Sequence, residues 1–125
     1  MLSSVELINL ALPICLEIPR QKRHVSLIFV KNRLITYGTN DFKTHPEAKK
    51  LGYLYNEMHS ELDAFRKVPK NLRNKKLTLV NIRTNAYGKL RMSRPCSVCE
   101  GWCVEVFDKI FYSDNEGINE LPFTY

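Results

Sequence analysis

The sequence has no apolar stretch long enough to cross a bilayer, since a membrane-spanning helix needs about 20 consecutive, mostly apolar residues. Its apolar N-terminal run, Leu7–Ile18, is interrupted by Pro13 and Glu17. No basic residue precedes that run, which makes it a poor secretory leader. The sequence also contains no internal repeat and no low-complexity segment. We therefore expect a cytoplasmic protein with no membrane partner.

Cysteine is scarce, with four in the chain, and three of them lie within eight residues of one another, at Cys96, Cys99 and Cys103. The fourth, Cys15, is distant in sequence. Four cysteines could form two disulfides, but this clustering is more typical of metal ligation in a reducing compartment. The cysteine pattern therefore favours a metal site.

The chain of 125 residues is long enough for a hydrophobic core, and we expect one domain over residues 1–125. The apolar fraction of 44% is ordinary for a globular protein and argues against global disorder. The net charge is +6, from 19 Lys and Arg against 13 Asp and Glu. This balance suits an anionic partner such as a nucleotide or nucleic acid, although a solvated basic surface has the same composition.

Local patterns predict an α/β fold. Ser3–Glu6 has the pattern of a helix capping box, and Val5, Ile8 and Leu12 then share one helical face up to Pro13, which is expected to break or kink the helix. Apolar spacing predicts strands at 24–30, 34–38, 77–82 and 110–112, and helices from 58 to before 69 and at 97–109. Strands that alternate with helices, after an initial hairpin, indicate a mixed sheet with helices against it.

Two motifs carry the chemistry, 58–64 (Met-His-Ser-Glu-Leu-Asp-Ala) and 94–99 (Arg-Pro-Cys-Ser-Val-Cys). Together they match H-x-E…P-C-x-x-C, the pattern of zinc-dependent nucleobase deaminases. A catalytic zinc takes three protein ligands and keeps a fourth position for water. Cys96 and Cys99 could supply two thiolates from the start of a helix, and His59 the third ligand.

Glu61 lies two residues past His59, and we expect it in the same pocket without ligating the metal. Bound zinc lowers the pKa of its water from about 15.7 to about 7, and a nearby carboxylate can take that proton and return it to the substrate. Other interpretations remain open. His59 could be a surface or core histidine, Glu61 a solvated helix residue, and Cys96 and Cys99 a redox pair or part of a structural site closed by Cys103. In an open catalytic site, Cys103 would be a small buried apolar residue.

The chain resembles the cytidine and deoxycytidylate deaminase superfamily, and most of all the small deoxycytidylate-deaminase-like proteins of bacteriophages. The resemblance covers nearly the whole chain, through the hairpin ending Tyr37–Asn40 and both motifs. It implies a three-layer α/β/α fold around a central mixed five-stranded sheet. It also implies one Zn²⁺ per chain, with His59, Cys96 and Cys99 as ligands and Glu61 as the proton shuttle.

The resemblance further implies hydrolytic deamination at C4 of cytosine, in which Glu61 protonates N3 and then the departing amine. A histidine as the first ligand favours the nucleotide, tRNA and polynucleotide branches over free-nucleoside enzymes. We therefore expect conversion of dCMP or CMP to the uracil nucleotide and ammonia. By analogy with other small members, we also expect a homo-oligomer. Two alternatives remain, a deaminase of cytosine or adenine in single-stranded DNA or RNA, and a binding protein that keeps zinc without turnover.

The expected substrate-binding residues are Asn40, Arg83 and Arg94. Asn40 matches an asparagine that contacts the sugar or base in related enzymes, and it could equally support a turn. Arg83 and Arg94 bound a basic stretch that is longer than in many members, and a guanidinium could hold a 5′-phosphate through a bidentate contact. A solvated basic hairpin gives the same pattern. The polar segment Phe42–Glu57 is predicted to be a long loop over the pocket.

Overall fold

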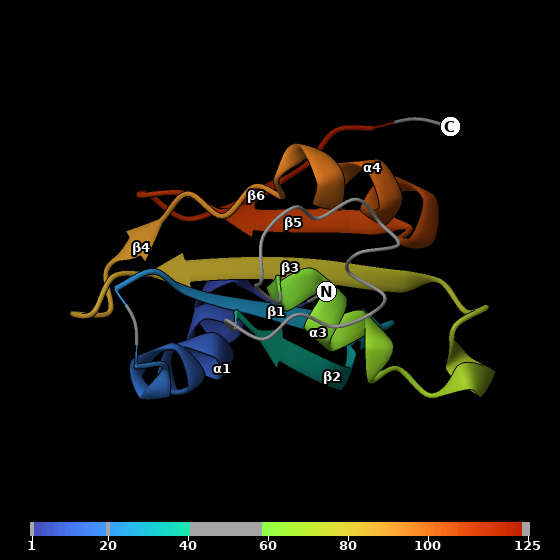
Figure 1. Ribbon diagram of the computed structural model, residues 1–125, viewed down its shortest axis with the longest axis horizontal. Coiled ribbons are helices and arrows are strands. Elements are labelled where there is room, and N and C mark those ends of the chain that lie inside the picture. The colour runs from blue at the N-terminus through green and yellow to red at the C-terminus, as the bar shows by residue number, and fades with distance from the viewer. Residues whose placement is uncertain (1, 20, 41–58, 124–125) are drawn as a thin grey trace.

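The computed structural model describes residues 2–19, 21–40 and 59–123 (Figure 1). In these residues the chain forms one mixed sheet of six strands and three α-helices, which confirms the predicted α/β class. The elements in chain order are α1 (Ser4–Glu17), β1 (Arg23–Val30), β2 (Arg33–Thr39), α3 (Ser60–Arg66), the 3₁₀ turn η1 (Lys70–Leu72), β3 (Leu77–Thr84), β4 (Leu90–Arg91), α4 (Ser97–Val106), β5 (Lys109–Ser113) and β6 (Ile118–Glu120).

The strand order is β2-β1-β3-β5-β6, and β4 pairs with β3. β1 and β2 form the predicted hairpin, and β3 runs antiparallel to β1 and parallel to β5. Parallel neighbours require a crossover connection, which the segment containing α4 supplies. The sheet has six strands where the resemblance implied five. The order β2-β1-β3-β5-β6 accounts for five strands, and the short strand β4, paired with β3, is the sixth.

Two clusters of buried apolar residues stabilise the sheet. β1 contributes Val25, Leu27 and Phe29 to the cluster that contains residues of α1, and Ile28 to the cluster that contains residues of α3 and α4. Successive side chains of a strand point to opposite faces, so a slip of one residue would exchange the two sets. Each fully buried side chain of this kind stabilises the fold by about 1.5–3 kcal/mol.

Helix α1 begins as predicted and ends later than predicted. Ser3 Oγ accepts a hydrogen bond from the Glu6 backbone N–H, and Glu6 Oε1 accepts one from the Ser3 N–H, both at 3.2 Å, which confirms the capping box. The helix does not break at Pro13 but continues to Glu17. Pro13 and Asn9, whose carbonyl loses its helical partner, are both exposed. Water can therefore satisfy that carbonyl, which lowers the cost of the proline.

Both long helices bury a different stripe from the predicted one. In α1 the predicted Val5 is 66% exposed, and the buried residues are Leu7, Ala11 and Cys15. Helix α4 ends at Val106 rather than at the predicted 109, and its buried residues are Cys99 and Cys103. The stripe predicted to be buried, Val98, Trp102 and Val106, is only partly buried. Each of these helices thus has cysteine among its buried residues.

Candidate metal centre

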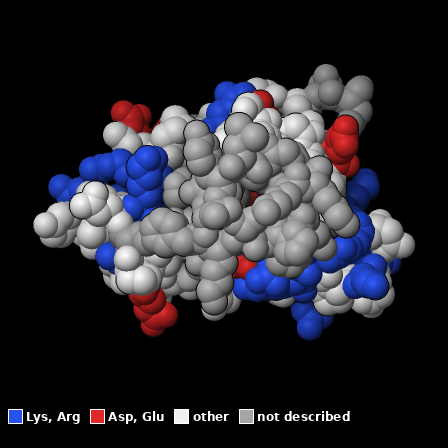
Figure 2. Space-filling view, viewed as in Figure 1, with Lys and Arg blue, Asp and Glu red and all other residues white. Residues whose placement is uncertain are grey.

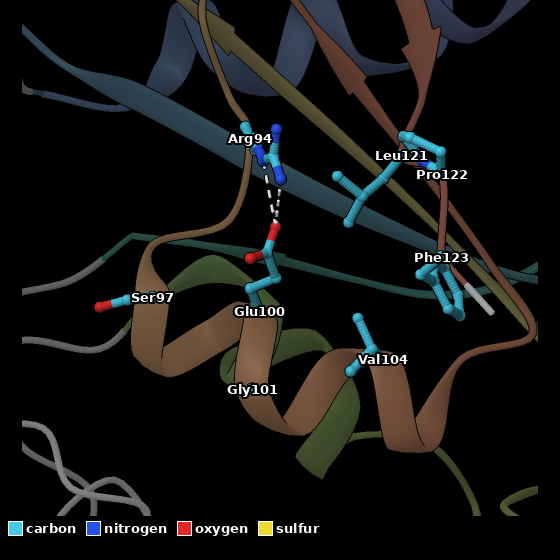
Figure 3. A pocket seen from close by; sticks show the side chains of 8 residues that line it. All are labelled: Arg94, Ser97, Glu100, Gly101, Val104, Leu121, Pro122 and Phe123. Atoms are coloured by element: carbon cyan, nitrogen blue, oxygen red, sulfur yellow. Dashed lines mark hydrogen bonds and ion pairs between the residues drawn. The ribbon is translucent and has the colours of Figure 1, made fainter. Parts of the chain in front are cut away.

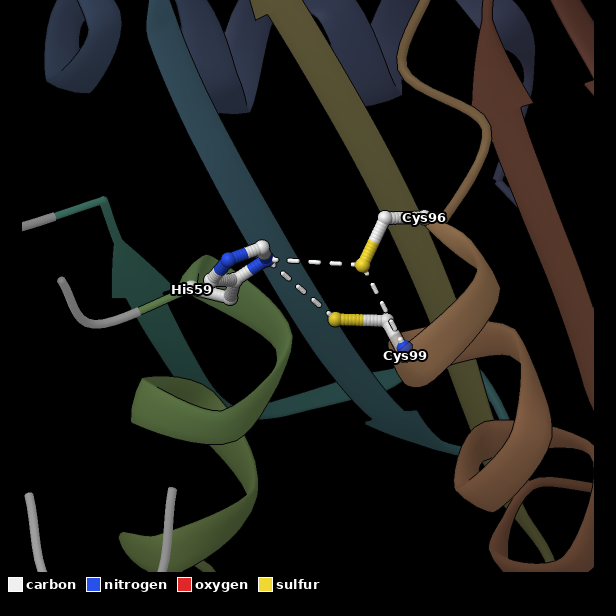
Figure 4. A group of neighbouring side chains, drawn as sticks. All are labelled: His59, Cys96 and Cys99. Carbon is white, nitrogen blue, oxygen red and sulfur yellow. Dashed lines mark hydrogen bonds between the residues drawn. The ribbon is translucent and has the colours of Figure 1, made fainter. Parts of the chain in front are cut away.

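Two helix N-termini meet on one side of the sheet (Figure 4). His59 is the N-cap residue of α3, Cys96 is the N-cap residue of α4, and Cys99 lies in the first turn of α4. The sequence separates His59 from Cys96 by 37 positions. The fold therefore brings together the three predicted ligands from two distant motifs.

Helix α3 is fixed against β2 by a close backbone approach. A Cβ atom at Gly38 would collide with the backbone of Ser60 and Ala64, so only glycine allows this spacing. Thr36 Oγ1 donates to the Ala64 carbonyl at 3.0 Å, and the Thr39 N–H donates to Asp63 Oδ2 at 3.0 Å. These contacts hold the start of α3, and with it His59, in place.

The three candidate ligand atoms lie within 4.8 Å of one another. His59 Nδ1 is 3.7 Å from Cys96 Sγ and 3.5 Å from Cys99 Sγ. In a tetrahedral zinc site with Zn–S of about 2.3 Å and Zn–N of about 2.0 Å, neighbouring ligand atoms are roughly 3.5–3.8 Å apart. The group can therefore hold a metal ion, and its donor set and spacing fit zinc.

The surroundings of Cys96 favour its thiolate. The pKa of Cys96 is lowered to about 4, first by a hydrogen bond with the Cys99 thiol and then by hydrogen bonds with His59 and the Cys99 backbone N–H, against the opposing effect of burial. That N–H lies 3.4 Å from Cys96 Sγ. Thiolate is the form that binds metals, so these contacts suit the group to its candidate role.

Cys103 does not join the group. It is fully buried in the cluster that contains Phe107 and Leu79, and burial raises the pKa of its thiol. Among the residues that the structure describes, no fourth His, Cys, Asp or Glu lies with His59, Cys96 and Cys99. The arrangement therefore differs from a structural site closed by Cys103.

Glu61 is buried, with 6% of its surface exposed, rather than solvated. Its Oε2 accepts a hydrogen bond from Asn81 Nδ2 at 3.1 Å, and its Oε1 accepts one from Ser60 Oγ at 3.3 Å. Burial raises the pKa of the Glu61 carboxyl, and the charge of nearby His59 acts in the opposite direction. A buried carboxyl beside the metal-ligand group is suited to proton transfer.

Several polar residues around Glu61 were not predicted from the sequence. Ser26 Oγ lies 2.6 Å from Asn81 Oδ1 and 2.8 Å from Ser60 Oγ, and all three side chains are buried. A detectable signal existed, because Ser26 and Asn81 are the polar residues within the otherwise apolar runs 25–30 and 79–82. Such residues are buried at a cost unless they find partners, so they mark a polar site.

His24, on β1, was also not predicted. Burial first, and then the charges of Arg83, His59 and Lys22, lower the pKa of His24 to about 4, with Cys96 acting in the opposite direction. His24 lies opposite Arg83 in the β1–β3 register. Arg83 Nη1 donates to the Met92 carbonyl at 3.4 Å, and its Nε is buried without a partner among the described residues. The predicted role of Arg83 in substrate binding stays a prediction.

Asn40 supports the backbone around β1. Its Oδ1 accepts from the His24 N–H at 3.1 Å, and its Nδ2 donates to the Lys22 carbonyl at 3.0 Å. Both ends of the amide are thus hydrogen-bonded to the backbone, which agrees with the alternative interpretation that Asn40 supports a turn. Contact between Asn40 and a substrate remains a prediction, and the predicted loop Phe42–Glu57 lies outside the described residues.

Arg94 pairs with Glu100 through its Nε at 3.0 Å and its Nη2 at 2.9 Å. Figure 3 shows this pair at a pocket of about 300 Å³ between α4 and the segment that follows β6. None of His59, Cys96 and Cys99 lines that pocket. The Arg94 guanidinium therefore forms an exposed ion pair with Glu100. The phosphate contact predicted for Arg94 stays a prediction.

Comparisons with protein-family models, curated proteins and solved structures gave no match. Within the described part of the chain, no helix is both long and apolar enough to span a membrane. The centre itself is therefore the basis for assigning a function.

Proposed function

We propose that this chain is a zinc-dependent hydrolytic deaminase of the cytidine and deoxycytidylate deaminase superfamily, which converts dCMP or CMP to the uracil nucleotide and ammonia. One observation carries the proposal. The starts of α3 and α4 bring His59, Cys96 and Cys99 within 4.8 Å, and buried Glu61 follows His59 by two residues. This is the residue set of the deaminase pattern. We further propose a three-layer α/β/α arrangement and a cytoplasmic location, where thiols stay reduced.

In this proposal His59, Cys96 and Cys99 hold one Zn²⁺, and Glu61 moves protons. When bound, zinc supplies Lewis acidity that makes water a competent nucleophile near neutral pH. The oxygen of the water joins C4 of cytosine, and the C4–N bond to the amino group breaks. Glu61 carries one proton of the water to N3 and the other to the amino group, which leaves as ammonia.

The test is to supply the zinc-loaded protein with dCMP, CMP, dCTP, cytidine and a cytosine-bearing single strand, and to measure ammonia. We expect release from dCMP or CMP, and release at least roughly 100-fold slower from the Glu61→Gln variant at the same zinc content. If zinc is bound and no compound releases ammonia, the deaminase proposal is wrong. A zinc-retaining binding protein would then be favoured.

A deaminase of single-stranded DNA or RNA is the second candidate, because the charge of the chain is concentrated. Residues 66–76 carry six of the 19 Lys and Arg and none of the 13 Asp and Glu, so their charge equals the net charge of +6. Arg66 and Lys67 pair with Asp63, whereas Lys70, Lys75 and Lys76 are exposed. Figure 2 shows Lys and Arg gathered at the end of the molecule where this segment lies. Such a surface attracts phosphates along a strand.

Salt dependence separates the two candidates. A polynucleotide that contacts several lysines releases several counterions, so its affinity falls steeply with salt. A mononucleotide gives a shallow dependence. Measuring KM for dCMP and for a short cytosine-bearing strand between low and moderate salt therefore assigns the substrate class.

A further inference from the structure

Asn81 joins the two halves of the candidate centre. This residue of β3 is 2% exposed, and its Nδ2 donates to Glu61 Oε2 at 3.1 Å and to the Ser93 carbonyl at 3.2 Å. Its Oδ1 lies 2.6 Å from the Ser26 hydroxyl. Every hydrogen-bonding group of the amide is therefore used, and one of its partners is the candidate proton carrier.

The second partner of Asn81 leads to the cysteines. Ser93 lies three residues before Cys96, and its hydroxyl donates to the Asn81 carbonyl at 2.8 Å. The Ser93 N–H donates to the Ser113 carbonyl at 2.8 Å, and the two hydroxyls are 2.9 Å apart. The segment before Cys96 is thus anchored to β3 and β5. Asn81 connects the carboxylate on α3 to this anchored segment.

The hydrogen-bond partners of Asn81 fix which way its amide faces. A donor is needed opposite a carboxylate, so Nδ2 must point to Glu61 and Oδ1 away from it. The Ser26 hydroxyl provides a donor to Oδ1 at 2.6 Å. Rotating the amide by half a turn would set Oδ1 against two acceptors, Glu61 Oε2 and the Ser93 carbonyl. The pair of contacts therefore selects one orientation.

We propose that Asn81 is a positioning residue that holds Glu61 Oε2, so that Oε1 is the oxygen that exchanges protons with the substrate. This inference rests on the proposed deaminase function. Among the side chains that the structure describes, the contact of Oε1 is the longer one, 3.3 Å to the Ser60 hydroxyl. A neutral amide suits the role, because it donates to a carboxylate and does not compete for the proton.

The kinetic test replaces the amide without changing its size. Zinc-loaded Asn81→Leu should lose roughly 10–100-fold in kcat, the range seen when groups that orient a metal site are removed, with KM and zinc content nearly unchanged. The matched control is Thr84→Val, on the same strand and 1% exposed, where alternation points the side chain to the other face. Its kcat should equal that of the wild type. A wild-type kcat in Asn81→Leu would overturn the inference.

A second variant keeps the inference testable if Asn81→Leu does not fold. Ser26→Ala keeps Asn81 and removes the donor to its Oδ1, so the amide is held less firmly and kcat should fall by a smaller factor than in Asn81→Leu, again with KM nearly unchanged. If Asn81→Leu does not fold, an unchanged kcat in Ser26→Ala overturns the inference.

An activity-independent readout separates this inference from the proposed function. In the zinc-loaded full chain, the melting temperatures of Asn81→Leu, Glu61→Met, which has a similar length and no carboxylate or amide oxygen, and the double variant form a cycle. We expect the double variant to lose less than the sum of the single losses, because either change removes the same hydrogen bond. Additive losses would overturn the inference even if the wild type is active. A wild type that releases no ammonia would reject the proposed function, and the cycle would still decide whether Asn81 holds Glu61.

Discussion

The two sides of β1 and β3 differ in what they bury. On the side of the cluster that contains α1, the buried side chains of these strands are apolar except for Thr84, and they include Leu27 and Val80. On the other side, Ser26 and Asn81 are buried with Ile28 and Leu79. An apolar interior maximises stability, whereas buried polar groups need partners and lower it otherwise. The difference indicates that one side maintains the fold and the other serves the candidate chemistry.

The largest effect should follow from removing a ligand on the polar side. His59→Ala or Cys96→Ala should lose bound zinc, and with it all deaminase activity, since only two protein donors remain. Elemental analysis of the purified variants measures this. Cys15→Ala, in the α1 cluster, is the matched control and should keep one zinc per chain. Full zinc occupancy in either ligand variant would contradict the assignment.

Replacing the buried carboxylate should separate chemistry from structure. Glu61→Gln keeps the size of the side chain and should keep zinc, while kcat falls by roughly 10²–10⁴-fold because general acid–base catalysis is lost. Stopped assays of ammonia release measure the change. Glu105→Gln, an exposed position on α4, should leave kcat as it is. Normal turnover by Glu61→Gln would exclude the proton-carrier role.

The apolar side should respond in stability rather than in chemistry. Leu27 is fully buried, and Leu27→Ala should lower the free energy of unfolding by about 2–5 kcal/mol because a cavity remains. Chemical denaturation measures the loss. At temperatures where the variant is folded, its zinc content and kcat should match the wild type. A large loss of kcat there would show that the two sides are coupled.

The exposed lysines near α3 should affect only long anionic substrates. Replacing Lys70, Lys75 and Lys76 together by Ala should reduce the slope of log affinity against log salt by roughly two for a single strand, about 0.7 for each phosphate that a lysine no longer neutralises. The KM for dCMP should not change. Fluorescence anisotropy with a labelled single-stranded nucleic acid measures the slope. An unchanged slope would show that the nucleic acid does not bind at these lysines.

The smallest expected effect is on pH dependence. His24 has a pKa of about 4 in the fold against an ordinary 6.5, so the unfolded chain binds more protons between these values. The resulting loss of stability is absent above pH 6.5 and grows as the pH falls toward 4. His24→Gln should remove this component, so its melting temperature should fall less than that of the wild type between pH 7 and pH 5. An equal fall in both proteins would assign the effect to other groups.

Local sequence predicted much of the centre but not its surroundings. The spacing of Cys96 and Cys99 at a helix start, and of His59 and Glu61 at another, is a local pattern that the fold brings together. The hydrogen bonds of Asn81 join residues 12 and 20 positions away in sequence. Their existence depends on strand register and helix placement, for which short windows carry no information.

The errors in the fold have similar causes. Pro13 was expected to break or kink α1, and the helix continues past it, because the effect of a proline depends on whether water reaches the carbonyl of Asn9, which is a tertiary property. The buried stripe of α1 was misplaced because Leu7 and Val5 are equally apolar by sequence, and only packing against the sheet chooses between them. Strand β6 was not predicted because the tail is polar, and its turn is built by Asp114 Oδ1, which accepts the N–H groups of Glu116 and Gly117.

Gly38 makes the geometry of the centre depend on a residue that belongs to neither motif. A methyl group at position 38 would force α3 outward from β2, and the displaced helix start would carry His59 out of reach of the thiolates. Damage at this position would therefore appear as a failure to retain zinc. A random screen for zinc-deficient variants should recover it alongside changes to the ligands themselves.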